Sequence, residues 1–258
     1  MISIYDWFGY EVSIKERYKL IKEAGFDSVL LWWSSGFGRG EDYRDGVRFA
    51  RNAGLEIENI HTPVQQQKEL SCDSLDGEAL FDCYINCIKD CSEFDISTMV
   101  VHLPNDVYPM NELGMNRIKR IVERAEHYNI KVAMENLFNL SNVACVLDSI
   151  DSENVGFCYD SCHHANNESA GDLLAKYGKR LMALHLHDNG GERNQHQLPL
   201  DGNIDWTIVM EKIAETGYTG TTALEPMNWD YENLTIVEFL NKAFHSAKTL
   251  EQMRFKLH

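Results

Sequence analysis

The chain has 258 residues, of which 44% are hydrophobic, and it carries a formal net charge of −16 from 24 basic and 40 acidic side chains. This length can bury one large core, and no linker rich in Pro, Gly and Ser divides the sequence, so we expect a single domain over residues 1–258. The acidic balance argues against nucleic acid and anionic membranes as partners, because proteins that bind DNA usually present a basic face.

The sequence also lacks signals for export or membrane insertion. No apolar run approaches the ~18 residues that cross a bilayer, and the opening MISIYDWFGY contains no basic region followed by an apolar one. The seven cysteines do not have the spacing of a disulfide scaffold. We therefore expect reduced thiols in a cytoplasmic protein, with Cys83, Cys87 and Cys91 as small core residues along one helix face.

Short runs rich in β-branched and apolar residues alternate with longer segments of helical periodicity along the chain. The first helix illustrates the pattern. It begins after Ser13 and ends at Gly25, and one of its faces is lined by Ile14, Tyr18 and Ile21. In chain order, the expected strands are 2–7, 26–33, 55–61, 97–104, 130–136, 154–160, 180–187 and 219–226. The expected later helices are 43–53, 78–94, a segment around 115–125, 141–149, 169–178, 205–215 and 232–253.

Eight strand–helix units in a chain of this length favour a closed (β/α)₈ barrel of the α/β class, since strands that alternate with helices build a parallel sheet. The alternative is an open doubly wound sheet. No Gly-rich phosphate-binding sequence follows the first expected strand, which weakens that alternative. In a barrel, the C-terminal ends of all strands meet at one mouth, where the chemistry of barrel enzymes takes place.

Six consecutive expected strands, from the third to the eighth, end in His, Asp or Glu. Taken singly, a histidine at a strand end can be structural, and an aspartate can cap the following helix, which is an alternative role for Asp160. We expect a helix cap at Asp205, before Trp206. Together, so many carboxylates and imidazoles are costly to bury unless a cation pairs with them. Oxygen and imidazole donors predict a divalent ion such as Mn²⁺, Zn²⁺, Mg²⁺ or Co²⁺. The strand-end residues are His61, His102, Glu135, Asp160, His163, His164, His185, His187 and Glu225.

The stretch LHLHDNGGERNQH, which begins at residue 184, contains three of the ten histidines: His185, His187 and His196. Side chains alternate in direction along a strand, so His185 and His187 both face the barrel interior, with His187 nearer the open end. One of them can bind an ion while the other lies in an adjacent layer.

The motifs AMEN, CYDSCHH, LHLHDNGGERNQH, GNIDW and ALEP, in this order, resemble those of the xylose isomerase-like TIM-barrel superfamily. Its members include ketose 3-epimerases, hydroxypyruvate isomerase, inosose dehydratase and endonuclease IV. The resemblance to the epimerases implies a divalent metal held by Glu135, Asp160, His187 and Glu225. An endonuclease-like alignment favours His185 over His187 as the imidazole ligand.

The same resemblance implies further site residues. In the epimerases, a histidine three residues after the metal-binding aspartate and an arginine six residues after the metal-binding histidine contact substrate, and His163 and Arg193 stand at these offsets. Endonuclease IV binds three zinc ions, and His61, His102 and His196 match three of its additional ligands. An aspartate that endonuclease IV places two residues before the last of these histidines is Asn194 here, which weakens a third zinc site.

These features favour a metal-dependent sugar or sugar-phosphate isomerase or epimerase in which Glu135 and Glu225 remove and return a proton next to a carbonyl. Histidines outside the metal set then hold substrate or form a second metal site: His61, His102, His163, His185 and His196. The alternatives are a zinc-dependent abasic-site DNA endonuclease, a lyase like inosose dehydratase and, least favoured, a non-catalytic binding protein. The resemblance also implies a homo-oligomer.

Four aromatic residues follow or end the first two expected strands: Trp7, Trp32, Trp33 and Phe37. Each can either stack on the apolar face of a sugar or pack in the core or rim. The identity of the substrate depends on the loops over the mouth, because loops carry specificity on a rigid scaffold. The loops concerned are 34–46, 62–76 and 104–112.

Overall fold

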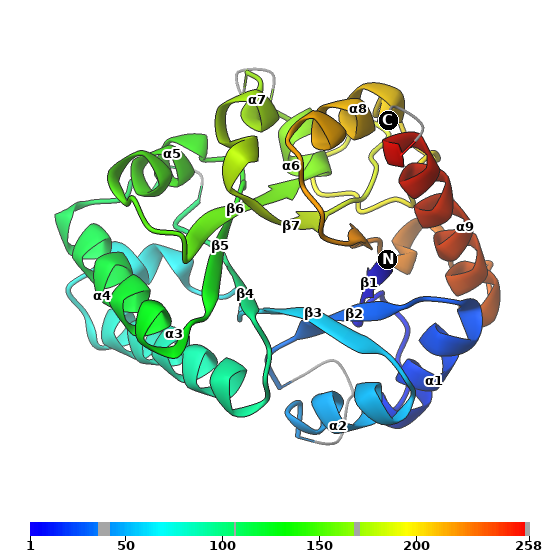
Figure 1. Ribbon diagram of the computed structural model, residues 1–258, viewed down its shortest axis with the longest axis horizontal. Helices are drawn as coiled ribbons and strands as arrows, with labels where there is room; N and C mark the ends of the chain where they lie inside the picture. Colours follow the sequence, from blue (N-terminus) through cyan, green and yellow to red (C-terminus); the bar gives the residue numbers. More distant parts are fainter. Residues whose placement is uncertain (36–41, 106, 168–170, 256–258) are drawn as a thin grey trace.

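The computed structural model describes residues 1–35, 42–105, 107–167 and 171–255 of the chain. Its strands are β1 (Ile2–Tyr5), β2 (Ser28–Trp32), β3 (Glu56–His61), β4 (Thr98–Val101), β5 (Lys131–Glu135), β6 (Val155–Asp160), β7 (Leu181–His185) and β8 (Thr222–Leu224). They form one eight-stranded sheet in the order β7-β6-β5-β4-β3-β2-β1-β8, with parallel pairing throughout (Figure 1).

The sheet closes on itself. β1 pairs with β8 as well as with β2, and a parallel bridge between Leu186 and Leu224 joins the chain just after β7 to β8. The predicted (β/α)₈ barrel is therefore confirmed, and the open doubly wound sheet is excluded.

Helices surround the barrel on its outside (Figure 1). They are α1 (Ile14–Ala24), α2 (Asp45–Asn52), α3 (Leu75–Glu93), α4 (Glu112–Tyr128), α5 (Leu140–Ser149), α6 (Ser161–Ala165), α7 (Leu173–Tyr177), α8 (Trp206–Glu215) and α9 (Ile236–Phe255). Three 3₁₀ helices, η1 (Gln67–Ser71), η2 (Gly178–Arg180) and η3 (Asn228–Asp230), complete the described elements. None of the described helices combines the length and the apolarity that a bilayer crossing requires.

The helix ends follow the local chemistry of the sequence. Ser13 caps α1 by accepting a hydrogen bond from the amide of Glu16, and Gly25 ends it in the left-handed region at φ 109°. Asp205 caps α8, as predicted, by accepting from the amides of Thr207 and Ile208. These ends are specified locally, so the sequence suffices to place them.

Two differences from the sequence expectation lie between β6 and β7. The helix expected at 169–178 is shorter, because Asp172 caps α7 by accepting from the amide of Ala175 and the chain then continues as η2; residues 168–170 lie outside the described part. The short helix α6 was not expected. It follows β6 directly, since the Asp160 side chain accepts a 2.7 Å hydrogen bond from the amide of His163 and caps the helix.

Two packing predictions have clear outcomes. Cys87 and Cys91 are buried, Cys83 is partly buried, and all seven cysteines are free thiols. Trp33 is buried away from the barrel mouth, where its Nε1 donates to Asp90 at 2.9 Å, so it packs in the helical layer and does not face a substrate. Phe37 lies outside the described residues.

Small side chains form the barrel interior directly below the predicted site. Val100, Ala133, Cys158 and Ala183 make one buried cluster. Each of them stands two residues before a strand-end residue of the predicted site, and therefore one layer deeper in the barrel. This layer supports the polar side chains above it.

The close approach of β6 and β7 gives a test of this scaffold. A Cβ atom at Gly156 would lie 2.4 Å from the carbonyl oxygen of Arg180 and 2.5 Å from the side chain of Met182. We expect Gly156→Ala to lower the free energy of unfolding by about 1–3 kcal/mol, because a backbone oxygen cannot move aside cheaply. Urea denaturation measures the change.

Gly190→Ala is the matched control, since its new Cβ would meet only the flexible ends of two side chains, Gln195 at 3.3 Å and Gln197 at 3.6 Å. We expect its stability to stay within about 0.5 kcal/mol of the wild type. Equal stability of Gly156→Ala and the wild type would contradict the close strand packing.

Candidate functional site

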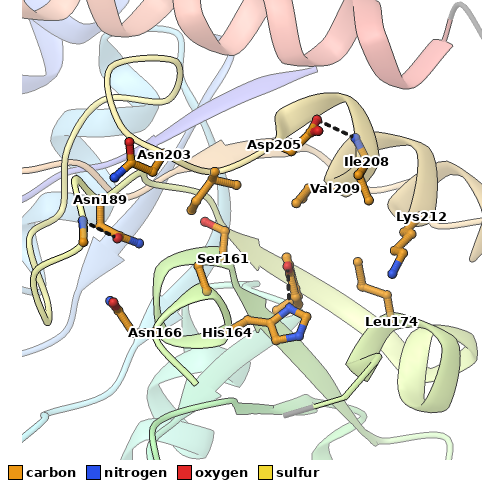
Figure 2. A pocket seen from close by; sticks show the side chains of 14 residues that line it. Ser161, His164, Asn166, Leu174, Asn189, Asn203, Asp205, Ile208, Val209 and Lys212 are labelled. Atoms are coloured by element: carbon orange, nitrogen blue, oxygen red, sulfur yellow. Dashed lines mark hydrogen bonds between the residues drawn. The ribbon is translucent and has the colours of Figure 1, made fainter. Parts of the chain in front are cut away.

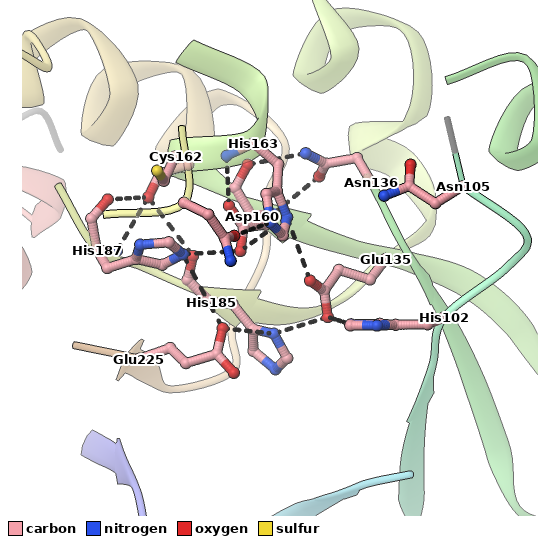
Figure 3. Close-up of polar contacts among 12 residues, drawn as sticks. His102, Asn105, Glu135, Asn136, Asp160, Cys162, His163, His185, His187 and Glu225 are labelled. Atoms are coloured by element: carbon pink, nitrogen blue, oxygen red, sulfur yellow. Dashed lines mark hydrogen bonds and ion pairs between the residues drawn. The ribbon is translucent and has the colours of Figure 1, made fainter. Parts of the chain in front are cut away.

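The polar side chains predicted from the strand ends meet at the C-terminal mouth of the barrel (Figure 3). His61, Glu135, Asp160 and His185 are the last residues of β3, β5, β6 and β7. His102 and Glu225 lie one residue beyond β4 and β8, and His163 is presented by α6. Glu135, Asp160, His185 and Glu225 are all at least 96% buried, so charged groups here must be compensated within the site.

Four side chains form the densest group of donor atoms. One oxygen each from Glu135, Asp160 and Glu225 and one nitrogen of His185 all lie within 4.8 Å of one another. His185 Nδ1 is 2.9 Å from Glu135 Oε2 and 3.3 Å from Glu225 Oε2. Three carboxylates and one imidazole around a common point match the donor preference of a divalent metal ion.

His187 lies beside this group. Its Nε2 is 2.9 Å from Asp160 Oδ2 and 4.0 Å from Glu225 Oε2. Its ring stacks on His196 at a centroid distance of 3.9 Å, and it shares a second donor group with His196 and Glu225. The hydroxyl of Ser161 holds the backbone of His187, donating to its carbonyl at 2.7 Å and accepting from its amide at 3.0 Å.

His61 and His102 form a third donor group with Glu135. His102 Nε2 lies 3.0 Å from Glu135 Oε2, and His61 Nε2 lies 3.6 Å from the same oxygen. His61 Nδ1 donates to the carbonyl of Thr62 at 2.9 Å, which leaves the lone pair of Nε2 directed into the site when the ring is neutral. His196 is oriented in the same way, with Nδ1 donating to the carbonyl of Glu225 at 2.9 Å.

His163 faces both carboxylates from β5 and β6. Its Nδ1 is 3.2 Å from Asp160 Oδ2 and 3.5 Å from Glu135 Oε1, while its Nε2 is 3.0 Å from the side-chain oxygen of Asn194. The structure thus brings together every metal-ligand candidate from the sequence. Asn194 also lies at the site, although it supplies an amide where a carboxylate would be a stronger ligand.

Burial and mutual charge set the protonation of this cluster. Burial alone would lower the pKa of His163, but the Asp160 and Glu135 carboxylates raise it to about 9. Burial lowers the pKa of His196 to about 3, with a further contribution from His187. Burial opposes ionisation of Glu135 and Asp160, yet the surrounding histidines keep both pKa values below their ordinary range. The carboxylates are therefore anionic and require positive charge nearby.

Two imidazole nitrogens that face these carboxylates lack a hydrogen bond of good geometry. Among the described residues, Nδ1 of His185 and Nδ1 of His163 are buried in this way, although each lies near a carboxylate oxygen. Buried polar atoms normally have partners, so these two atoms indicate a ligand-binding site. The donor groups that the carboxylates and histidines form fit a divalent ion.

A cavity of about 440 Å³ lies above the donor groups and opens to solvent, within the size range of small-molecule sites. Tyr5, Trp7 and Trp32 line one part of it. Arg193 lines another part, with its guanidinium 3.8 Å from the centroid of the Phe138 ring. Further lining residues come from the loops over the mouth: Val64, Gln67, Asn105, Leu137, Asn194, Met227 and Trp229.

Four residues that line the cavity were not predicted individually from the sequence: Tyr5, Asn105, Phe138 and Trp229. Phe138 and Trp229 follow Glu135 and Glu225 by three and four residues, so their position shortly after a strand end was a usable signal. What the sequence did not show is the direction in which each loop folds over the mouth.

A second cavity, of about 610 Å³, lies between α6, α7 and α8 (Figure 2). Its imidazole, His164, is already engaged by the Tyr159 hydroxyl and the carbonyl of Gly171, both at 2.9 Å. Although this cavity is larger, the grouped carboxylates and histidines lie at the barrel mouth, so we assign the chemistry to the mouth.

The match to a family model is consistent with this architecture. The chain belongs to the xylose isomerase-like TIM barrel family, whose model matches residues 18–243. An uncharacterised protein of Sinorhizobium fredii is 26% identical over 98% of this chain and 94% of its own length. An uncharacterised protein of Methanocaldococcus jannaschii is 28% identical over 66% of this chain. The match covers 64% of that relative's own length.

Some of the relatives and solved structures are named for an activity. A probable endonuclease 4 of Mycoplasma capricolum is 23% identical over 71% of this chain and 75% of its own. The structure of D-psicose 3-epimerase from Clostridium cellulolyticum superposes with a TM-score of 0.77 at 16% identity, covering 98% of both chains. The IOLI protein, solved with a zinc atom, superposes with a TM-score of 0.76 at 14% identity, over 100% of this chain and 99% of its own. The two solved structures show that this chain shares their fold.

The raised pKa of His163 predicts how the stability of the metal-free protein depends on pH. A histidine titrates near pH 6.5 when unfolded and His163 near 9 when folded, so its contribution is fully present below pH 6.5 and is lost as the pH rises to 9. Urea denaturation in the presence of a chelator, at intervals between pH 6.5 and 9.5, measures this loss. We expect His163→Gln to flatten the decline.

The neighbouring His164→Gln serves as a control, because His164 faces Tyr159 and lies outside the donor groups. It should keep the wild-type slope. Identical slopes for wild type and His163→Gln would show that His163 is not held protonated by the two carboxylates.

Proposed function

We propose that this protein is a divalent-metal-dependent sugar isomerase or epimerase that removes a proton from a carbon next to a carbonyl. The observation that carries the proposal is the buried group of three carboxylates and one imidazole beneath an aromatic-lined cavity. Two of the carboxylates, Glu135 and Glu225, reach the cavity from different strands, as removal and return of a proton on two faces of one carbon require. The epimerase and IOLI likenesses support this choice.

We assign the metal ligands to Glu135, Asp160, His185 and Glu225. The resemblance to the epimerases favoured His187 in this set and the endonuclease-like alignment favoured His185; we choose His185 because one of its nitrogens lies within 4.8 Å of an oxygen from each of the three carboxylates. The register of the sheet gives the reason, since Asp160 and His185 are direct partners across β6 and β7 while His187 lies beyond the end of β7. His187 then orients Asp160 through its Nε2.

Glu135, Asp160, His185 and Glu225 would hold the ion, which when bound would supply Lewis acidity to offset the negative charge that develops on the substrate oxygens. Zn²⁺, Mn²⁺, Mg²⁺ and Co²⁺ all suit a set of three carboxylates and one imidazole. One of Glu135 and Glu225 removes the proton from one face of the carbon, and the other delivers a proton to the opposite face. General acid–base catalysis of this kind typically contributes ~10²–10⁴-fold. His163 and Arg193 border the cavity and bind substrate oxygens, and His61 and His102 orient Glu135.

The proton-transfer role predicts an isotope experiment. In D₂O, the metal-loaded protein incorporates deuterium into a ketose next to its carbonyl, and NMR follows the label in a panel of free and phosphorylated ketoses. Glu135→Gln and Glu225→Gln should lower exchange by about 10²-fold or more, because each removes a base while keeping the size of the side chain. Removal of the metal by a chelator should have the same effect.

Circular dichroism and metal content control for lost folding or lost metal. Full exchange in Glu135→Gln with metal still bound would remove Glu135 from the role of base. Loss of water from the product, seen as a mass change, would favour a lyase, since an isomerase leaves the mass unchanged.

The metal assignment is tested by a pair of matched substitutions two residues apart. We expect His185→Ala to weaken metal binding at least 100-fold, since it removes a ligand, and His187→Ala to weaken it about 10-fold, since it removes a group that orients Asp160. Titration calorimetry with Zn²⁺ and Mn²⁺ measures both. A larger loss in His187→Ala than in His185→Ala would restore the assignment of His187 as ligand.

One observation favours a second candidate, a metal-dependent abasic-site endonuclease. His61, His102 and Glu135 form a further donor group, so more than one ion can bind, and some relatives are named as endonucleases. The net charge of −16 and the amide at Asn194 oppose this candidate. Cleavage of abasic-site duplex that persists through purification and disappears in Glu135→Gln would favour it over sugar chemistry.

A further inference from the structure

The indole of Trp229 occupies an unusual position at the rim of the mouth. Trp229 belongs to η3 and lines the same cavity as Glu135 and Glu225, yet 52% of its surface is exposed. Its ring meets His196 edge to face at a centroid distance of 5.4 Å, and His196 in turn stacks on His187. A row of three rings therefore leads from the donor groups to the outer edge of the cavity.

The segment that carries this indole is held firmly. Oδ2 of the adjacent Asp230 accepts hydrogen bonds from Gln195 Nε2 at 2.9 Å and from Gln197 Nε2 at 2.7 Å. The amide of Met227 donates to the carbonyl of His196 at 2.8 Å. Trp229 is thus presented to solvent by fixed backbone on both sides, and an aromatic face so placed provides ready-made apolar area for a ligand.

The charge around the cavity limits what can bind there. Among the described residues that line the cavity there is no lysine and one arginine, Arg193, whose guanidinium lies over the Phe138 ring. Glu135 and Glu225 line the floor and Asp230 borders Trp229. Next to Trp229 in the chain the charged residue is the acid Asp230, so at this part of the rim an uncharged ring with an apolar face suits the exposed indole better than a doubly charged phosphate does.

We propose that Trp229 forms a second sugar subsite, so that the preferred substrate is a ketose carrying another sugar unit rather than a free or phosphorylated ketose. This inference rests on the proposed function for the position of the reacting sugar at the donor groups. The reacting ketose then lies over Glu135 and Glu225, and the attached sugar stacks on Trp229. Aromatic stacking of this kind contributes about 0.5–1.5 kcal/mol beyond area burial.

Three sugars that differ at one oxygen test the subsite. D-Fructose has a free O6, isomaltulose carries a neutral glucosyl group there, and D-fructose 6-phosphate carries a charged group. We expect kcat/KM for deuterium exchange to be about tenfold higher for isomaltulose than for either other sugar. Trp229→Ala should remove most of this preference, and Trp229→Phe should retain it because a ring remains.

Val237→Ala, on the exposed face of α9, is the control and should preserve the preference. Titration calorimetry of the metal-loaded protein with fructose and isomaltulose tests the subsite without turnover. Tighter binding of isomaltulose than of fructose that depends on Trp229 supports the subsite. If no sugar exchanges deuterium while this preference holds, the proposed isomerase or epimerase function is contradicted and the subsite is not.

Two other results overturn the subsite and leave the proposed function standing. One is exchange that is as fast with fructose or its phosphate as with isomaltulose. The other is an equal loss for all three sugars in Trp229→Ala. A decrease in molecular mass of Trp229→Ala by light scattering would also overturn it, by assigning the indole to a contact between copies of the chain.

Discussion

The burial of three carboxylates around one point is the constraint on which the rest of this molecule depends. Glu135, Asp160 and Glu225 are almost completely removed from water, and they lie close enough to repel one another strongly. Histidines surround them, and His163 is held protonated by two of them. Such an arrangement requires positive charge inside it, and this requirement is the physical basis of the proposed divalent-cation site.

The strands of the barrel fix the positions of these side chains. The carboxylates and His185 stand at or one residue beyond the ends of four strands, and the small residues below them leave the barrel interior filled but not crowded. The pairing of Asp160 with His185 across β6 and β7 places one imidazole against the donor group. Ser161 then fixes the continuation of β7 through the backbone of His187. The arrangement of the donor atoms therefore depends on strand register.

The side chains that form the donor groups and those that form the cavity walls come from different parts of the barrel. The donor groups sit on strands, whereas the cavity walls that meet a substrate come mainly from loops, including Phe138, Arg193 and Trp229. A rigid centre with variable walls is the arrangement by which one barrel serves many reactions. This chain is similar both to a protein named as an epimerase and to proteins named as endonucleases, and a fold does not by itself select a sugar or a nucleic acid.

Much of this organisation was determined by the sequence alone. Strand and helix periodicity, the caps Ser13 and Asp205 and the acidic or imidazole ends of six strands are local features, so the barrel and the residues of its centre could be predicted. Which histidine joins the carboxylates was decided only by the tertiary structure, because it depends on where β7 ends and how it pairs with β6. The same holds for Trp32 and Trp33, which point to opposite sides of the sheet, and for Trp229, whose place at the mouth depends on contacts between loops distant in sequence.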